Sequence, residues 1–168
     1  DALLKGDANA CVRKGKYADF IPSSRDLAGA ELEIANAKNR DYVLKTALDP
    51  VKDKYDFVFI DCAPSINLTL INALSASDGV IVPLQCEYFA LEGLNQLLNT
   101  VRLVKKHSNE SLRLYGILLT MFRQTKLSRE VEQSVRETFK DKVFETVIPQ
   151  NVRLAESPSF GQPIIEFD

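Results

Sequence analysis

An aspartate stands at the end of a short apolar run in the stretch FVFIDCAPS, from Phe57 to Ser65. A carboxylate at the end of a buried strand is costly to desolvate unless a cation meets it. Magnesium, bound to Asp61 directly or through a water, fills this role in many α/β proteins that hydrolyse nucleotides. Aspartate also ends parallel strands where it caps the next helix. The run alone therefore leaves two interpretations open, a Walker B aspartate and a structural cap.

Cysteine and histidine usage does not indicate a metal centre or a disulfide framework. The cysteines are odd in number and form no C-x-x-C pair: Cys11, Cys62 and Cys86. This usage is typical of reduced thiols in a cytosolic protein. The single His107 follows two lysines, which is typical of a solvated helix end rather than a metal site.

The charge is unevenly distributed along the chain, although the net charge of −2 argues against a uniformly basic nucleic-acid binder. Between Val101 and Lys142 the sequence has ten Lys or Arg residues against five Asp or Glu residues. This surplus has two interpretations, solvated helix faces or one basic face that binds a polyanion. A length of 168 residues is typical of a single domain, and no apolar run is long enough to span a bilayer.

The elements that would position Asp61 alternate between strand and helix patterns. Strands are predicted at Tyr17–Pro22, Phe57–Asp61, Gly79–Pro83, Leu112–Met121 and Lys142–Pro149. Helices are predicted at Asp26–Ala37 with a cap from Asp26 or Ser24, before Pro50, at Asn67–Ser75, at Ala90–Lys106, and from Leu127 to Phe139. This order predicts an α/β fold, a three-layer, doubly wound, mainly parallel sheet with helices on both faces. Ligands of such sheets bind at the carboxyl ends of the strands, which is where Asp61 would lie.

Several long motifs occur together and in one order. They are IPSSRDLAGAELE, YDFVFIDCAPS, PLQCEYFALEGL, LLTMF and VIPQNVRLAESPSFGQPI. In this combination the chain resembles the ParA/Soj family of chromosome and plasmid partitioning ATPases, which are deviant-Walker P-loop NTPases. The resemblance covers nearly the whole chain. It implies ATP and magnesium as cofactors, an ATP-bound homodimer, non-specific DNA and a ParB-type protein as partners, no membrane, and a cytoplasmic, nucleoid-associated location.

The resemblance also implies roles for individual residues. Asp61 would be the catalytic, magnesium-side aspartate, with Ser65 on the switch-like turn after it. Nucleotide-binding residues would be Pro64, Met121, Phe122, Pro149, Gln150 and Asn151. The dimer face would include Glu87, Tyr88 and Glu92. DNA contacts would come from Arg153 and from either Arg123 or Lys126, because the loop between Met121 and Leu127 is one residue shorter than is usual in the family.

The sequence departs from the family in two further respects. Ala63 replaces a common proline, and none of the seven glycines belongs to a G-x-x-x-x-G-K-[ST] phosphate-binding loop. We therefore expect a single but partial domain over residues 1–168, lacking the N-terminal P-loop strand and the last helical part, and inactive as an ATPase by itself. The alternative is a non-catalytic DNA- or protein-interaction domain that retains the fold. A MinD-like membrane regulator is disfavoured, since no C-terminal amphipathic anchor is present.

Overall fold

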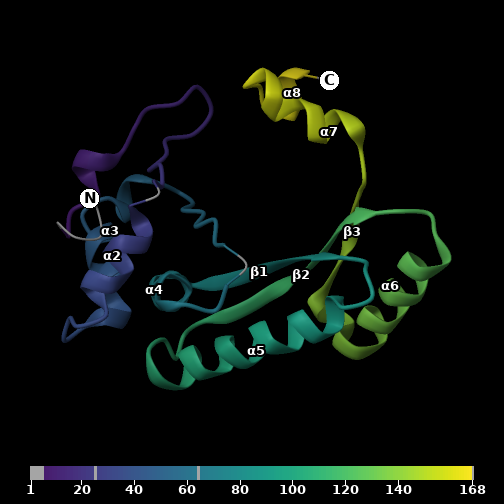
Figure 1. The fold of residues 1–168 in the computed structure, drawn as a ribbon, viewed down its shortest axis with the longest axis horizontal. Helices are drawn as coiled ribbons and strands as arrows, with labels where there is room; N and C mark the ends of the chain where they lie inside the picture. The colour runs from purple at the N-terminus through teal and green to yellow at the C-terminus, as the bar shows by residue number, and fades with distance from the viewer. Residues whose placement is uncertain (1–5, 25, 64, 168) are drawn as a thin grey trace. The chain divides into compact units, whose positions relative to one another are not determined.

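The computed structural model describes residues 6–24, 26–63 and 65–167 as an alternation of helices and strands (Figure 1). The N-terminal part contains helices α2 (Leu27–Ile34), α3 (Val43–Leu48) and α4 (Leu68–Ala76). The middle part contains strand β1 (Gly79–Gln85), helix α5 (Ala90–His107) and strand β2 (Arg113–Phe122). The C-terminal part contains α6 (Lys126–Phe139), β3 (Val143–Pro149), α7 (Val152–Glu156) and α8 (Ile164–Phe167).

The strands form one sheet in the order β1–β2–β3 (Figure 1). Strand β3 runs parallel to β2, with Ile117 opposite Val143 and Phe122 opposite Pro149. Helix α6 connects these two strands, so β2, α6 and β3 form a βαβ crossover. The fold class predicted from the sequence, an α/β fold with a parallel sheet, is confirmed.

Two predicted strands are not formed as predicted. Residues 57–63 belong to no helix or strand, although Phe57–Asp61 was expected to pair within the sheet. The reason is physical: a strand is stabilised by ladder hydrogen bonds, and no neighbouring strand in the described part of the chain pairs with this run. Similarly, the predicted strand Tyr17–Pro22 contributes only one antiparallel bridge, between Arg13 and Phe20.

The predicted helices are present with small changes in their ends. Helix α5 buries one apolar stripe, formed by Leu94, Leu98, Val101 and Val104, as the spacing of four and three residues predicts. Helix α3 ends at Leu48, before Pro50 as expected. Asp26 lies at the N-cap position of α2, but its side chain makes no capping hydrogen bond. Among the helices of the described residues, none is long and apolar enough to cross a membrane.

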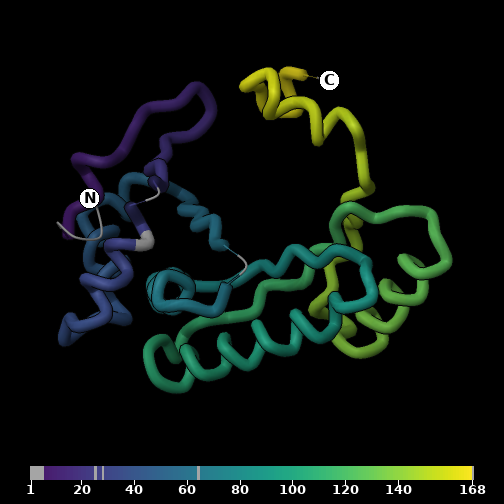
Figure 2. Tube along the Cα trace, viewed as in Figure 1, coloured from purple at the N-terminus to yellow at the C-terminus, as the bar shows by residue number. Residues whose placement is uncertain are grey.

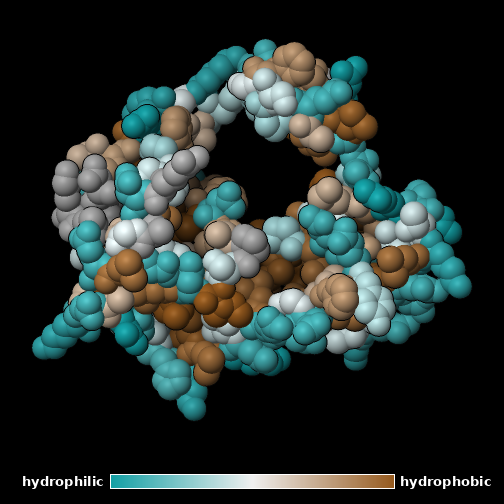
Figure 3. Space-filling view, viewed as in Figure 1, coloured by the Kyte–Doolittle hydropathy of each residue, from teal (hydrophilic) through white to brown (hydrophobic). Residues whose placement is uncertain are grey.

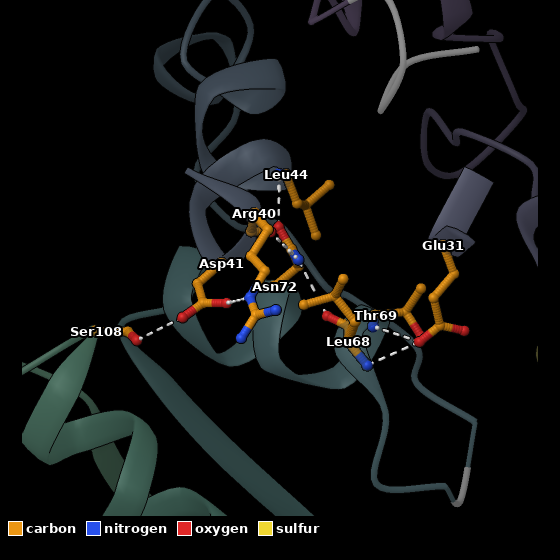
Figure 4. Close-up of polar contacts among 8 residues, drawn as sticks. All are labelled: Glu31, Arg40, Asp41, Leu44, Leu68, Thr69, Asn72 and Ser108. Atoms are coloured by element: carbon orange, nitrogen blue, oxygen red, sulfur yellow. Dashed lines mark hydrogen bonds and ion pairs between the residues drawn. The ribbon is translucent and has the colours of Figure 1, made fainter. Parts of the chain in front are cut away.

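Contacts divide the chain into two compact units, Asp1–Gly79 with Leu97–Arg113, and Val80–Gln96 with Leu114–Asp168. In the first unit, the buried Asn72 of α4 is a polar centre of the core (Figure 4). Its Oδ1 accepts from the Leu44 N–H at 3.1 Å, and its Nδ2 donates to the Arg40 carbonyl at 2.7 Å and to the Leu68 carbonyl at 3.0 Å. One side chain thus fixes α4 against the start of α3.

A second set of polar contacts joins the end of α5 to the same unit. Ser108 Oγ donates to Asp41 Oδ2 at 3.4 Å (Figure 4). Asn109 Nδ2 donates to the carbonyls of Leu74 at 2.9 Å and Ser77 at 2.7 Å. These bonds supply donors to carbonyl groups at the C-terminal end of α4, where the regular hydrogen-bond pattern of the helix stops.

We expect Asn72→Ala to lower the free energy of unfolding by about 2–3 kcal/mol, because it removes the hydrogen-bond partners of the Leu44 N–H and the Arg40 carbonyl. Urea denaturation followed by circular dichroism measures the change. Asn39→Ala is the matched control, since Asn39 is exposed and its side chain makes no capping bond. Equal unfolding free energies for the two variants would show that the Asn72 contacts add no stability.

Candidate functional site

The carboxyl ends of β2 and β3 meet in the second unit, as the parallel topology predicts. Phe122 lies opposite Pro149, and the Gln150 N–H donates to the Phe122 carbonyl at 3.0 Å. Arg123 Nε also donates to Gln150 Oε1. Four of the expected nucleotide-binding residues, Met121, Phe122, Pro149 and Gln150, are therefore brought together at one edge of the sheet. Their contact with a nucleotide stays a prediction.

Met121 has an unusual backbone at this edge. Its φ is +49°, in the left-handed region that non-glycine residues rarely adopt. Its side chain is about half exposed, whereas Phe122 is half-buried beside it. This conformation lies where the pairing of β2 with β3 shifts register, between Leu119 and Phe122, so it accompanies a β-bulge at the end of the strand.

Asn151, a further expected nucleotide residue, has a clear structural role. Its Oδ1 accepts from the Arg153 N–H at 2.7 Å and so caps the N-terminus of α7. Asparagine is among the preferred capping residues because its short side chain satisfies an unpaired helix N–H. Because Asn151 Oδ1 already accepts a hydrogen bond from the chain itself, we expect a ligand to contact the Nδ2 group.

The three candidate DNA-binding cations lie in this unit, and each has a local partner. Arg123 donates to Gln150, Lys126 Nζ lies 3.6 Å from Glu130, and Arg153 Nη1 lies 3.5 Å from Glu156. The side chains of Lys126 and Arg153 remain 91% and 57% exposed, so a phosphate has access to both. Thr125 fixes the start of α6 by accepting from the Ser128 N–H at 3.2 Å.

The expected dimer face lies in the turn between β1 and α5 and in the first turn of α5. Glu87, Tyr88 and Glu92 are exposed, and the Tyr88 ring lies edge-on to Phe89 at 5.0 Å. The preceding Cys86 is buried. Burial raises the pKa of its thiol, and the negative charge of Glu132 raises this pKa further. Cys86 is accordingly a protonated core residue, and the exposed aromatic pair is the part of this turn that a partner would meet.

Asp61 belongs to the first unit and lies in the extended run that precedes α4. Its carboxylate is exposed, and the turn after it is closed by a bond from the Ser65 N–H to the Ala63 carbonyl at 2.8 Å. Pro64 lies outside the described residues. The magnesium role of Asp61 stays a prediction.

Sequence reasoning missed the role of Glu31 at the N-terminus of α4. This carboxylate of α2 accepts from the Leu68 N–H at 2.7 Å and from the Thr69 N–H at 3.4 Å (Figure 4). Asn67 supplies the second cap, accepting from the Leu70 N–H at 3.1 Å. The exit of the Asp61 segment is therefore fixed by a residue far away in the sequence, which no local spacing signal reveals.

The described residues hold no group of three or more His, Cys, Asp or Glu side chains that could by itself bind a metal ion. Magnesium is usually held in proteins by one or two carboxylates together with phosphates and waters. The exposed carboxylate of Asp61 has the chemistry for such a site. A backbone cradle for the phosphates is not encoded in the printed sequence.

Comparison with known proteins decides the family. The chain is 56% identical over 151 residues to the sporulation initiation inhibitor protein Soj of Bacillus subtilis, covering 89% of this chain and 60% of that protein. It is 50% identical over 171 residues to the chromosome-partitioning ATPase Soj of Treponema pallidum, covering 99% of this chain and 68% of that protein. The chain belongs to the ParA/Soj family. A family model described as an AAA domain also matches residues 4–114.

A solved structure has a similar fold. The cobyrinic acid a,c-diamide synthase of Mycobacterium smegmatis, which carries a bound ATP analogue and magnesium, is similar with a TM-score of 0.82 and 35% identity. The match covers 90% of this chain and 61% of that one. The chain thus spans about 60–68% of the length of these three proteins.

Proposed function

We propose that the full-length protein is a ParA-type ATPase that partitions chromosomes or plasmids in the cytoplasm at the nucleoid. The observation that carries this proposal is the identity of 50–56% to two Soj proteins over most of this chain. In this proposal the protein dimerises when it binds ATP, then binds DNA without sequence preference. A ParB-type partner would stimulate hydrolysis and release.

The residues of this chain have distinct tasks in that cycle. Asp61 would hold magnesium, which screens the charge of the transferred phosphate when it is bound. Met121, Phe122, Pro149 and Gln150 would frame the adenine at the end of the sheet, where their backbones are already fixed. Further contacts are proposed for Pro64 and Asn151. The exposed residues Glu87 and Tyr88 of the turn before α5, and Glu92 of α5, would face the second protomer.

A second candidate is a non-catalytic interaction domain of the same fold. It is favoured by one observation, the lack of a G-x-x-x-x-G-K-[ST] motif in the printed sequence. Determining the gene sequence upstream of the codon for Asp1 distinguishes the ATPase from the interaction domain. A phosphate-binding loop with its lysine there would support the ATPase, and an open reading frame without it would support the interaction domain.

DNA binding is tested with Arg153→Glu in the full-length, ATP-bound protein. We expect weaker binding to all duplexes alike, because Arg153 would contact phosphates rather than base edges. The slope of log affinity against log salt should flatten by about 0.9 for each lost phosphate contact. Fluorescence anisotropy with two unrelated duplexes at several salt concentrations measures both effects.

Lys38→Glu is the matched control, since it makes the same charge change at an exposed lysine outside the candidate set. It should leave the salt slope unchanged. A strong preference of the wild type for one duplex would overturn the non-specific mode. An unchanged slope in Arg153→Glu would remove Arg153 from the DNA contact.

A further inference from the structure

Arg153 lies near the start of a C-terminal segment, residues 150–167, that folds back on itself (Figure 2). Helix α7 is followed by a 3-10 turn at Ser157–Phe160, and Gly161 reverses the chain with a φ of +64°. The Gln162 N–H closes this reversal by donating to the Ser157 carbonyl at 3.3 Å. Helix α8 therefore returns beside α7.

Two side chains of this segment hold the guanidinium of Arg153. Glu156 Oε2 lies 3.5 Å from Arg153 Nη1, one helical turn along α7. The Phe167 ring of α8 lies with its centroid 5.7 Å from Arg153 Cζ, within the range of a cation–π contact. Phe167 is itself supported by Phe160, with 5.1 Å between ring centroids. Apolar side chains are visible at the surface of this segment in Figure 3, and Phe160 is 67% exposed.

The two contacts have opposite consequences for an incoming phosphate. Glu156 lies within ion-pair distance of the guanidinium, so its negative charge offsets part of the Arg153 charge and repels the phosphate. Phe167 carries no charge, so it neither cancels the charge of the guanidinium nor repels a phosphate. The ring also limits the rotamers of a long side chain, which lowers the entropy lost on binding.

We propose that Glu156 is a built-in competitor that weakens the polyanion contact of Arg153, whereas Phe167 is a positioning residue that strengthens it. This inference rests on the proposed DNA contact of Arg153. Glu156 sets the affinity low enough for release, and Phe167 presents the guanidinium in a fixed orientation to the phosphate. The pair tunes one contact in opposite directions.

The test is fluorescence anisotropy of the full-length protein on labelled duplex DNA, with a non-hydrolysable ATP analogue and magnesium. We expect Glu156→Gln to tighten binding by about two- to fivefold at low salt, an effect that shrinks as salt screens the exposed pair. Phe167→Leu should weaken binding about two- to fivefold, and Phe167→Tyr, which keeps the ring, should bind as the wild type does. Glu145→Gln is the control for net charge, because Glu145 is an exposed residue of β3.

A double-mutant cycle separates this inference from the proposed function. In an Arg153→Ala background, Glu156→Gln and Phe167→Leu should each lose most of their effect. If Arg153→Ala weakens binding but Glu156→Gln equals Glu145→Gln, the competitor role is overturned while the DNA contact stands. If Phe167→Tyr binds as weakly as Phe167→Leu, the positioning role is overturned. If Arg153→Ala binds as the wild type does, the proposed contact fails, and the inference with it.

Discussion

Asp61→Ala is expected to abolish ATP hydrolysis by the full-length protein, with a loss of about a hundredfold or more. The physical reason is that a carboxylate holding magnesium contributes several kcal/mol of charge stabilisation in the transition state. The fold should be unaffected, because Asp61 is exposed in a run that belongs to no helix or strand. Phosphate release under saturating ATP and magnesium measures the effect, and thermal melting checks the fold.

Asp56→Ala provides the matched control for this experiment. Asp56 is an exposed aspartate at the start of the same run, and its removal changes the net charge equally. It should hydrolyse ATP at close to the wild-type rate. Undiminished turnover in Asp61→Ala would assign the catalytic metal contact to another residue, and the Walker B interpretation of Asp61 would then be wrong.

The 168-residue chain alone is expected to self-associate through the run that contains Phe57 and Phe59. Their side chains are 79% and 86% exposed, and their rings stack on one face with 6.4 Å between centroids. An extended apolar run without a ladder partner invites pairing with another chain. Burying both rings would contribute about 4 kcal/mol, roughly a thousandfold in association constant.

Phe57→Ser/Phe59→Ser should therefore be monomeric at concentrations where the wild-type chain forms larger species in sedimentation velocity. Leu32→Ser is the control, since Leu32 is 75% exposed but lies in α2, where the backbone is satisfied within the helix. Its association should match the wild type. A monodisperse wild-type chain with a cooperative melt would mean that this run does not pair between molecules.

The sequence predicted the elements whose signal is local and long. Helices α5 and α6 follow from apolar residues at helical spacing, and β2 and β3 coincide with the strands predicted at Leu112–Met121 and Lys142–Pro149. The meeting of Phe122 with Gln150 was predictable as well, because parallel strands end at the same edge of a sheet. Helices and strands that can be recognised from the spacing of apolar residues within one element were therefore predicted well.

The features that sequence reasoning missed depend on partners. Phe57–Asp61 has the composition of a strand, yet a strand needs a neighbour to pair with, and composition does not supply one. Glu31 acts on α4 across 37 positions, a contact that only the tertiary structure creates. The ion pair between Arg153 and Glu156 could have been predicted from the sequence, because residues three apart on a helix lie on the same face. The contact between Phe167 and Arg153 could not have been predicted, because it depends on the reversal of the chain at Gly161.

The left-handed backbone of Met121 also constrains how this position changes between lineages. For a residue with a Cβ atom this conformation costs about 1–2 kcal/mol, a cost that glycine avoids and asparagine partly avoids. Substitution of Met121 by glycine or asparagine should therefore be tolerated, because both residues relieve the backbone strain. Valine, isoleucine and threonine should be excluded, because their branched Cβ raises the cost of the left-handed conformation. The end of β2 thus filters substitutions by backbone geometry, independently of any selection on nucleotide chemistry.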